Sequence, residues 1–301
     1  MPDTIAIIAQ GEMGSAVGGR LRQNGARVLT SLQGRSAASR KRAEQHGLEA
    51  IDSDDELVRQ ADFFLSILPP GDAPVLAERL RGPLTSSQRK PIYVDFNAIA
   101  PATASRIGGI LAATGCLYLD GGIIGGPPKG TSPGPKFYIS GDKANEAERL
   151  GVYGLRIVVL DAPTGAASAL KMSYAGFTKG ITGLASAMIA GSLRAGCGGA
   201  LRAELLDSQP DLVAWLGRHV PGMPGKAYRW VAEMEEIAAF LHDDPAAQAI
   251  YTGLARRYED LAAAAAAGKA DGEVALLKKF ISELAAELAR PEADKVARKR
   301  A

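Results

Sequence analysis

Short apolar segments alternate with amphipathic ones along the first half of the chain. The first apolar segment, residues 5–9, contains no polar alternation, which predicts a strand buried on both faces, as in a parallel sheet. After it, Met13, Val17 and Leu21 recur at helical spacing and predict a helix. Further strands are predicted at residues 26–30, 63–68, 92–94, 117–120, 137–140 and 156–160, and helices at residues 36–46, 52–60, 73–80, 101–114 and 143–150. This alternation predicts an α/β fold with a doubly wound, Rossmann-like parallel sheet.

The second half of the chain has a different pattern, which is rich in alanine and lacks strand signals. Helices are predicted at residues 165–193, 200–206, 211–216, 226–241, 246–267 and 271–288, and the charged residues 290–301 are expected to fray. In the first of these helices Gly176, Gly180 and Gly183 are spaced for close contact with another helix. We therefore predict two domains, a sheet domain at residues 1–163 and an all-α domain at residues 164–301.

A glycine turn joins the first predicted strand to the first helix. It resembles the pattern G-x-G-x-x-G, in which dinucleotide phosphates bind the N-terminus of the helix, but Ala9 occupies the first glycine position. Gly11 would let the backbone approach the phosphates, and Gly14 would let the helix pack close to the strand. An ordinary strand–helix turn is the alternative. The predicted cofactor-binding residues of this turn are Ala9, Gln10, Gly11, Glu12, Met13 and Gly14.

The segment after the second strand favours NADP over NAD, with NAD still possible. An acidic residue at this place would bind the ribose 2′-hydroxyl group of NAD, but residues 30–36 contain none. Ser31, Arg35 and Ser36 could instead hold a 2′-phosphate. The alternative for Arg35 is a solvated loop charge. At the carboxyl ends of the later strands, Leu68, Pro69 and Asn97 are expected to lie beside the nucleotide.

Composition excludes several other classes of function. The formal net charge of +2 over 301 residues gives no broad basic surface for nucleic acid, and no apolar run is long enough for a membrane span. The chain begins without a leader-like segment. Two distant cysteines, Cys116 and Cys197, are expected to be buried free thiols of a cytoplasmic protein. The three histidines lack ligand spacing, so no metal site is predicted.

Four motifs of this chain resemble, in their order, those of the β-hydroxyacid dehydrogenase superfamily, which includes 6-phosphogluconate and 3-hydroxyisobutyrate dehydrogenases. Residues 11–14 resemble its G-x-M-G turn, residues 95–97 its D-x-S-T segment, and residues 120–126 its substrate loop D-A-P-V-S-G-G. Residues 165–172 resemble the start of the interdomain helix that bears the family's catalytic lysine. The pattern most resembles a little-characterised subgroup related to phosphogluconate dehydrogenase.

The resemblance implies roles for particular residues of the substrate site. Lys171 matches the catalytic lysine, and an amine in such an apolar helix can act as general acid and base. Tyr174, one helical turn further, could share this role or could be a packed aromatic residue. The glycine-rich stretch that follows the strand ending at Asp120 is expected to be a loop that binds the substrate. Its expected contacts, together with one lysine further along the helix, are Gly121, Gly122, Ile123, Ile124 and Lys179.

Two departures from the family pattern change the expected substrate. Ile124 replaces the loop serine, and Ala175 replaces an asparagine four residues after the lysine, so two polar substrate contacts are missing. A bulkier, less polar substrate than 3-hydroxyisobutyrate is therefore expected. For Lys179, a charge at the interface between the domains is the alternative interpretation, and the one that the sequence slightly favours.

We predict an NADP-dependent oxidoreductase that transfers a hydride between its cofactor and a hydroxy acid, a keto acid or a related carbonyl compound. An imine reductase on the same fold is one alternative, favoured by the lost carboxylate contacts and disfavoured by Lys171. A non-enzymatic NADP-binding regulator is another. The expected partners are a small-molecule substrate and, as the resemblance implies, a second copy of the chain in a homodimer.

Overall fold

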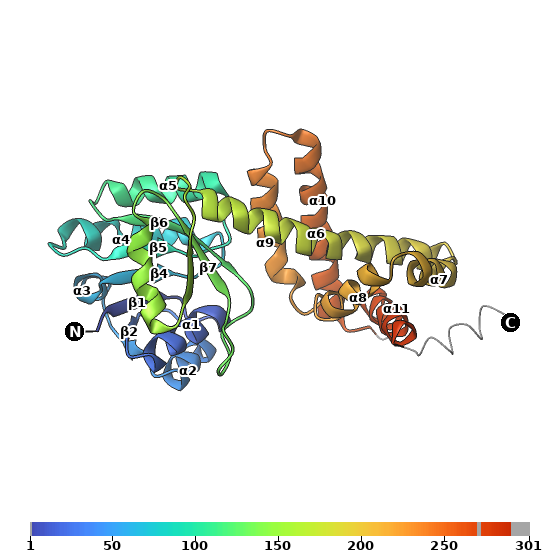
Figure 1. Cartoon of the computed structure of the whole chain (residues 1–301), viewed down its shortest axis with the longest axis horizontal. Helices are drawn as coiled ribbons and strands as arrows, with labels where there is room; N and C mark the ends of the chain where they lie inside the picture. The colour runs from blue at the N-terminus through green and yellow to red at the C-terminus, as the bar shows by residue number, and fades with distance from the viewer. Residues whose placement is uncertain (1, 270–271, 290–301) are drawn as a thin grey trace. The chain divides into compact units, whose positions relative to one another are not determined.

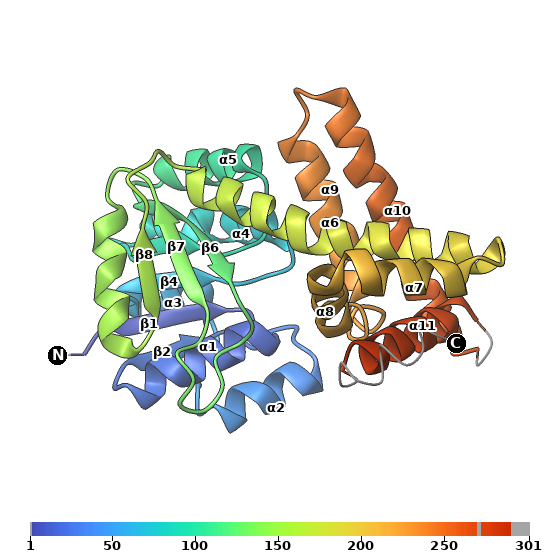
Figure 2. The same ribbon diagram turned by 45° about the vertical axis from the view of Figure 1, so that its right-hand side comes forward.

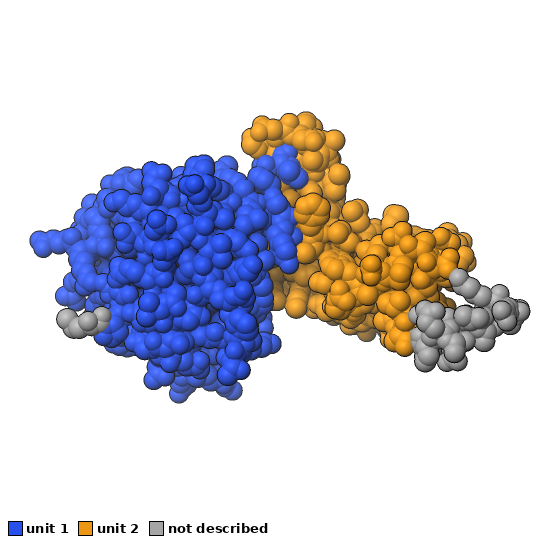
Figure 3. All heavy atoms as spheres, viewed as in Figure 1, with its two compact units in different colours: residues 1–174, 239–241 blue, residues 175–238, 242–301 orange. Residues whose placement is uncertain are grey.

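The computed structural model describes residues 2–269 and 272–289 (Figure 1). The chain forms two compact units, which are coloured in Figure 3. The first unit contains residues 1–174 and 239–241, and the second contains residues 175–238 and 242–301. The tail that was expected to fray, residues 290–301, lies outside the described residues.

The first unit is built on an eight-stranded sheet with the order β3-β2-β1-β4-β5-β6-β7-β8. The strands are β1 (Thr4–Ile8), β2 (Arg27–Thr30), β3 (Glu49–Ala50), β4 (Phe63–Ser66), β5 (Ile92–Asp95), β6 (Tyr118–Ile124), β7 (Lys136–Ser140) and β8 (Arg156–Val159). The order of the first six strands is that of a dinucleotide-binding Rossmann sheet. All neighbouring strands are parallel except β6 and β7. The predicted α/β fold is confirmed, with one antiparallel pair that the prediction of a parallel sheet did not include.

Helices cover both faces of this sheet, because successive side chains of its strands point to opposite faces and both sets are apolar. One buried cluster joins the sheet to α1 (Glu12–Gln23), α2 (Ala37–Gln45) and the 3₁₀ helix η1 (Ala144–Tyr153). The other joins it to α3 (Asp54–Gln60), α4 (Asp72–Ser86) and α5 (Pro101–Ala112). Figure 2 shows α4 and α5 on one side of the sheet and α1 and α2 on the other.

Several element predictions for the first unit were wrong in detail. The two-residue strand β3 was not predicted, α4 continues past Leu80 through Pro83, and the helix expected at residues 143–150 is a 3₁₀ helix. The largest difference concerns the glycine-rich stretch that follows Asp120. It was expected to be a loop, but β6 continues through Ile124 because β7 pairs with it from Asp120 to Ile124.

The helix α6 (Ala166–Arg194) begins in the first unit and ends in the second, where α7 (Gly198–Ser208), α8 (Pro210–His219), α9 (Ala227–Phe240), α10 (Pro245–Ala267) and α11 (Glu273–Leu288) follow. Glycines of α6 permit close contact with α10, as predicted. A β-carbon at Gly176 would lie 2.9 Å from the hydroxyl oxygen of Tyr251, and one at Gly183 would lie 2.7 Å from Cδ2 of Leu254.

Both cysteines are free thiols, as predicted, but only Cys116 is buried. Cys197 is exposed because it lies at the N-terminal end of α7, between Gly196 and Gly198, which have no side chains to cover it. Among the described residues, no helix is both long and apolar enough to cross a membrane.

Candidate functional site

The turn between β1 and α1 places its two glycines in different environments. A β-carbon at Gly14 would lie 2.0 Å from the carbonyl oxygen of Ala9, so only glycine fits there. At Gly11 the backbone has φ −72° and ψ −173°, which any residue can adopt, and a β-carbon would meet no atom within 4 Å. Among the described residues, no side chain makes a capping hydrogen bond at Gly11, the residue before α1. An open space beside an uncapped helix N-terminus can admit a phosphate group.

This difference between the two glycines gives a matched pair of variants. We expect Gly14→Ala to lower the free energy of unfolding by on the order of 3 kcal/mol, because its methyl group would overlap the backbone. Gly11→Ala is expected to change the stability by less than about 0.5 kcal/mol. It should nevertheless weaken dinucleotide binding by about tenfold or more, since the methyl group would occupy the open space. Urea unfolding and cofactor titration of both variants test this expectation, and equal stability of the two variants would contradict it.

Gln10 fixes this turn to the neighbouring strand. Its side-chain Nε2 donates hydrogen bonds to the carbonyl oxygen of Ile7 at 3.0 Å and to Oγ1 of Thr30 at 2.8 Å. Thr30 in turn donates to the same carbonyl oxygen at 2.9 Å. The Gln10 side chain is fully buried, so its predicted contact with a cofactor could be made only through the backbone.

The sequence analysis missed Arg42, which contacts the same turn. Its Nε donates to the carbonyl oxygen of Gln10 at 2.9 Å, and its Nη2 donates to Oγ of Ser39 at 3.2 Å. Ser36, Ser39 and Arg42 follow one another at intervals of three along the first turns of α2, which is the signal that could have revealed this polar face.

The three residues predicted to hold a 2′-phosphate lie at the carboxyl end of β2. Ser31 is buried directly after the strand, and Ser36 caps α2 by accepting a hydrogen bond from the backbone N–H of Ser39 at 3.3 Å. Within the described part of the chain, the guanidinium group of Arg35 makes no ion pair or hydrogen bond. It is therefore available to a ligand.

Asn97 joins the carboxyl ends of β4 and β5. Its Oδ1 accepts a hydrogen bond from the backbone N–H of Leu68, and its Nδ2 donates to Oγ of Ser66 at 2.8 Å. Its own N–H donates to Oδ1 of Asp95 at 2.8 Å. Three residues at these strand ends were predicted to lie beside the nucleotide. Asn97 is buried, whereas Leu68 and Pro69 reach the surface.

Asp95 is a buried acid beneath this contact. The pKa of its carboxyl group is raised from 3.8 to about 7, mainly by burial and in part by the nearby Asp120, against the opposing effect of the hydrogen bonds from Asn97. Its Oδ2 has no hydrogen-bond partner among the described residues. The protonated form is therefore the one that the folded protein favours.

This raised pKa makes stability depend on pH. Because the folded pKa of Asp95 exceeds the unfolded one, its contribution is fully present below about pH 4 and is lost as the pH rises through about 7. Between pH 5 and 8 we expect the wild type to lose on the order of 2 kcal/mol of stability relative to Asp95→Asn, which cannot ionise. Urea unfolding of both proteins at both pH values measures this difference, and parallel pH profiles would contradict the expectation.

Asp120 anchors the start of α6 to the sheet. Its Oδ2 accepts hydrogen bonds from Oγ of Ser140 at 2.8 Å and from the backbone N–H groups of Gly165 at 2.9 Å and Ser168 at 3.1 Å. Its Oδ1 accepts one from Oγ of Ser168 at 2.5 Å. Ser140 also accepts a hydrogen bond from the backbone N–H of Ala167 at 3.0 Å. The sequence analysis did not predict these anchoring contacts, which fix the helix that carries Lys171.

The glycines of β6 bring Lys171 against the sheet. A β-carbon at Gly122 would lie 2.9 Å from the carbonyl oxygen of Ala167 and 3.1 Å from Cβ of Lys171. One at Gly121 would lie 2.7 Å from Cδ1 of Phe96. Side chains alternate along a strand, so Ile124 lies on the same face as Gly122 and Lys171.

Not all of the remaining predicted substrate residues lie beside Lys171 and Gly122. Ile123 is buried in the apolar cluster that α1 covers. Tyr174, three residues after Lys171, is 49% exposed. Lys179 belongs to the second unit, where its ammonium group pairs with the carboxylate of Glu233 and lies 5.3 Å from the ring centre of Trp230. Substrate binding by Lys179 stays a prediction.

One row of paired residues crosses the sheet and separates the core from the candidate site. Ile8 pairs with Ser66, Ser66 with Asp95, and Asp95 with Asp120. Immediately beyond this row, at the same edge, lie the glycine turn at residues 9–14, Leu68, Pro69, Asn97 and the glycines beside Lys171. The first unit therefore brings most of the predicted cofactor and substrate residues to one edge.

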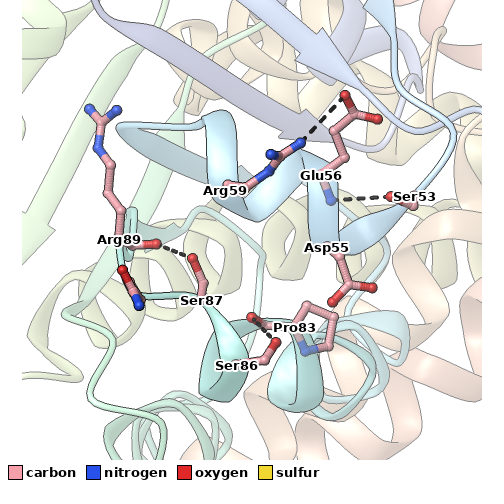
Figure 4. Close-up of a pocket in the computed structure, with 9 residues that line it drawn as sticks. Ser53, Asp55, Glu56, Arg59, Pro83, Ser86, Ser87 and Arg89 are labelled. Carbon is pink, nitrogen blue, oxygen red and sulfur yellow. Dashed lines mark hydrogen bonds and ion pairs between the residues drawn. The ribbon is translucent and has the colours of Figure 1, made fainter.

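The pocket in Figure 4 lies elsewhere in the first unit. It has a volume of about 710 Å³ and lies between α3 and the end of α4. Its lining residues are Ser53, Asp55, Glu56, Arg59, Pro83, Ser86, Ser87, Gln88 and Arg89. None of them is a predicted site residue, and Arg59 lies 3.9 Å from the carboxylate of Glu56 in an exposed pair of little strength. Within the described residues, no group of three or more His, Cys, Asp and Glu side chains could hold a metal ion.

Two family models match parts of the chain. Residues 4–151 match the NAD binding domain of 6-phosphogluconate dehydrogenase, and residues 193–261 match a domain of unknown function, DUF1932. These matches, together with the similarity to 3-hydroxyacid dehydrogenases described below, support the β-hydroxyacid dehydrogenase superfamily that the sequence motifs predicted.

Two relatives show how far the similarity extends. An uncharacterised 28.5 kDa protein of Methanothermus fervidus is 28% identical over 180 residues, which are 60% of this chain and 67% of that protein. A probable 3-hydroxyisobutyrate dehydrogenase of Mycobacterium tuberculosis is 26% identical over 141 residues, 47% of each chain. The match thus spans about half the length of that dehydrogenase.

Solved structures extend the likeness over nearly the whole chain. Conserved protein MTH1747, described as structurally similar to 3-hydroxyacid dehydrogenases, is 27% identical with a TM-score of 0.65, covering 88% of this chain and 99% of that one. The V8 variant of an imine reductase from Myxococcus stipitatus, in complex with NAD⁺, shares the fold at 20% identity, with a TM-score of 0.58 over 93% of this chain and all of that one.

Proposed function

We propose that this protein is an NADP-dependent oxidoreductase that transfers a hydride to or from a hydroxy acid, a keto acid or a related carbonyl compound. The observation that carries the proposal is the shared edge of the first unit. There, the glycine turn and Lys171 lie beyond one row of paired residues.

The residues at this edge fit a nicotinamide dinucleotide. The open space at Gly11 and the uncapped N-terminus of α1 suit the pyrophosphate, and Arg35 with Ser31 and Ser36 would hold a 2′-phosphate. Leu68 and Pro69 would line the nucleotide site, while Asn97 holds their backbone in place. A bound nicotinamide would supply or accept the hydride.

Lys171 would move the proton that accompanies hydride transfer. In reduction its ammonium group would donate a proton to the carbonyl oxygen of the substrate, and in oxidation the neutral amine would take the hydroxyl proton. Tyr174, one turn further along α6, would assist at the substrate. Ile124 lies on the same face as Lys171, which favours a substrate with an apolar group over a small polar hydroxy acid.

The same apolar face supports a second candidate, reduction of a C=N bond, as in the imine reductase with this fold. Lys171 favours the first candidate, because an iminium carbon that accepts a hydride needs no proton donor at an oxygen. A screen of ketones, hydroxy acids and cyclic imines separates the two candidates, with NADPH oxidation or NADP⁺ reduction as the measured signal. Turnover of imines alone would replace the carbonyl proposal, and turnover of neither class would favour a cofactor-binding regulator.

We also propose that the chain forms a homodimer, as its family resemblance implies. Its cytoplasmic location, inferred from two isolated cysteines, stays a prediction.

A further inference from the structure

Arg42 joins the glycine turn at residues 9–14 to the helix α2. It precedes the buried Ala43, which packs α2 into the same apolar cluster as α1. Its Nε donates a hydrogen bond to the carbonyl oxygen of Gln10 at 2.9 Å, and its Nη2 donates one to Oγ of Ser39 at 3.2 Å. One guanidinium group therefore contacts both the glycine turn and the first turn of α2.

The contacts continue from Ser39 to Ser36, one of the residues proposed to hold the 2′-phosphate. Oγ of Ser36 donates a hydrogen bond to Oγ of Ser39 at 3.2 Å. The same Ser36 oxygen accepts a hydrogen bond from the backbone N–H of Ser39 at 3.3 Å. A short chain of hydrogen bonds thus leads from Ser36 through Ser39 and Arg42 to the glycine turn.

The carbonyl group that Arg42 contacts belongs to the peptide unit between Gln10 and Gly11. The N–H of this planar unit is the N–H of Gly11, the residue with open space beside it. Among the described residues, this N–H donates to no acceptor. A hydrogen bond at the carbonyl end polarises the unit and makes its N–H a stronger donor. Arg42 therefore acts on a donor of the proposed pyrophosphate site without having to touch the ligand.

The charge of Arg42 is not neutralised at this place. Its two acceptors are neutral oxygen atoms, and within the described part of the chain no carboxylate pairs with it. A positive charge beside an N–H that has no acceptor suits an anion such as a phosphate group. The neighbouring Lys41 carries the same charge but is exposed and makes no contact with the turn.

We infer that Arg42 is a positioning residue that holds the glycine turn in its phosphate-binding conformation and links this turn to Ser36. The inference rests on the proposed function, because it assumes that a dinucleotide binds at the turn. The role differs from that of Arg35, which would contact the 2′-phosphate alone. Loss of Arg42 should therefore weaken the binding of both NADPH and NADH, whereas loss of Arg35 should affect NADPH only.

The first test is a fluorescence titration of the full-length protein with NADH and with NADPH. Arg42→Ala should weaken the binding of both by about tenfold, a typical effect of losing one hydrogen bond to a charged group. Arg42→Lys keeps the charge and one donor, and should bind NADH at least about threefold more tightly than Arg42→Ala. Arg42 is only partly buried, so water can reach the carbonyl group of Gln10 in these variants and the fold should persist. Circular dichroism checks this.

The matched control is Lys41→Ala, which removes the same charge from the next residue of α2. Because this lysine is exposed and screened by salt, both affinities should change by less than about twofold.

The second test measures the glycine turn without any nucleotide. Backbone hydrogen exchange of residues 11–15 should be at least about threefold faster in Arg42→Ala than in the wild type, because the turn has lost its contact with α2. Lys41→Ala should exchange at the wild-type rate.

Several results would overturn the inference. One is a folded Arg42→Ala that binds both nucleotides, or exchanges its turn, as the wild type does. Another is a loss of NADPH binding alone, since Arg42 would then be a further ligand of the 2′-phosphate. Equal losses in Arg42→Ala and Lys41→Ala, or equal binding by Arg42→Ala and Arg42→Lys, would also overturn it. A wild type that binds neither nucleotide would instead contradict the proposed function, and hydrogen exchange would still show whether Arg42 holds the turn.

Discussion

Replacing Lys171 with alanine is expected to lower turnover by about 10²–10⁴-fold, the usual contribution of a general acid and base. The affinity for NADPH should remain within about twofold of the wild type. The reason is distance within the sheet. Lys171 lies against Gly122 of β6, whereas the glycine turn predicted to bind the phosphates follows β1, and β4 and β5 lie between β1 and β6. Steady-state rates on any substrate found in the screen, together with cofactor titration of the same preparation, measure both quantities.

Two further variants make the test of Lys171 specific. Lys171→Arg keeps a positive charge but cannot release its proton near neutral pH, so it should be almost as inactive as the alanine variant. Lys278→Ala removes an exposed lysine of α11 and should leave turnover unchanged. Full turnover by Lys171→Ala would exclude the acid–base role.

Loss of the Asp120 carboxyl group is expected to destabilise the first unit strongly. Asp120→Ala would leave the donors of Ser140, Gly165 and Ser168 without their acceptor inside the protein. Each buried donor without a partner costs about 1–3 kcal/mol, and because neighbouring contacts are not additive we expect a total loss of roughly 3 kcal/mol. Urea unfolding measures this loss.

The control for Asp120 is Ser140→Ala, which removes one donor to the carboxyl group and one acceptor of α6, and should cost about 1 kcal/mol. If enough folded Asp120→Ala remains at low temperature, its turnover should fall while NADPH affinity is retained, because the helix that positions Lys171 has lost its anchor. An alanine variant as stable as the wild type would show that these contacts do not hold α6 in solution.

The fold was predictable where an apolar run, or apolar residues at helical spacing, continued over many residues. The first strand, the glycine turn and α6 are examples, and Pro101 marked the first residue of α5. The glycine-rich end of β6 was not, because glycine has low strand propensity and only pairing with β7 keeps the backbone extended there. The antiparallel direction of β7 was also hidden, because a short apolar run does not reveal which way its strand runs.

The candidate site was predictable where a residue's role depends on neighbours that are close in the sequence. Gly14 is such a residue, since the close approach of Ala9 leaves room for nothing larger. Arg42 and Asp120 were missed, because their partners are 32 and up to 48 residues distant in sequence and meet them only in the folded sheet. The place of Asn97 beside the nucleotide stays a prediction, and the structure adds that its side chain joins two strand ends, which the sequence did not reveal.

The most direct test of the central claim is a fluorescence titration of the purified protein with NADPH and, separately, with NADH. The account predicts that NADPH binds at least about tenfold more tightly, a difference of about 1.4 kcal/mol. Arg35→Ala should remove this preference and leave NADH binding unchanged, because the guanidinium group would contact only the 2′-phosphate. Failure of the wild type to bind either nucleotide would contradict the assignment of the dinucleotide site, and with it the proposed hydride transfer.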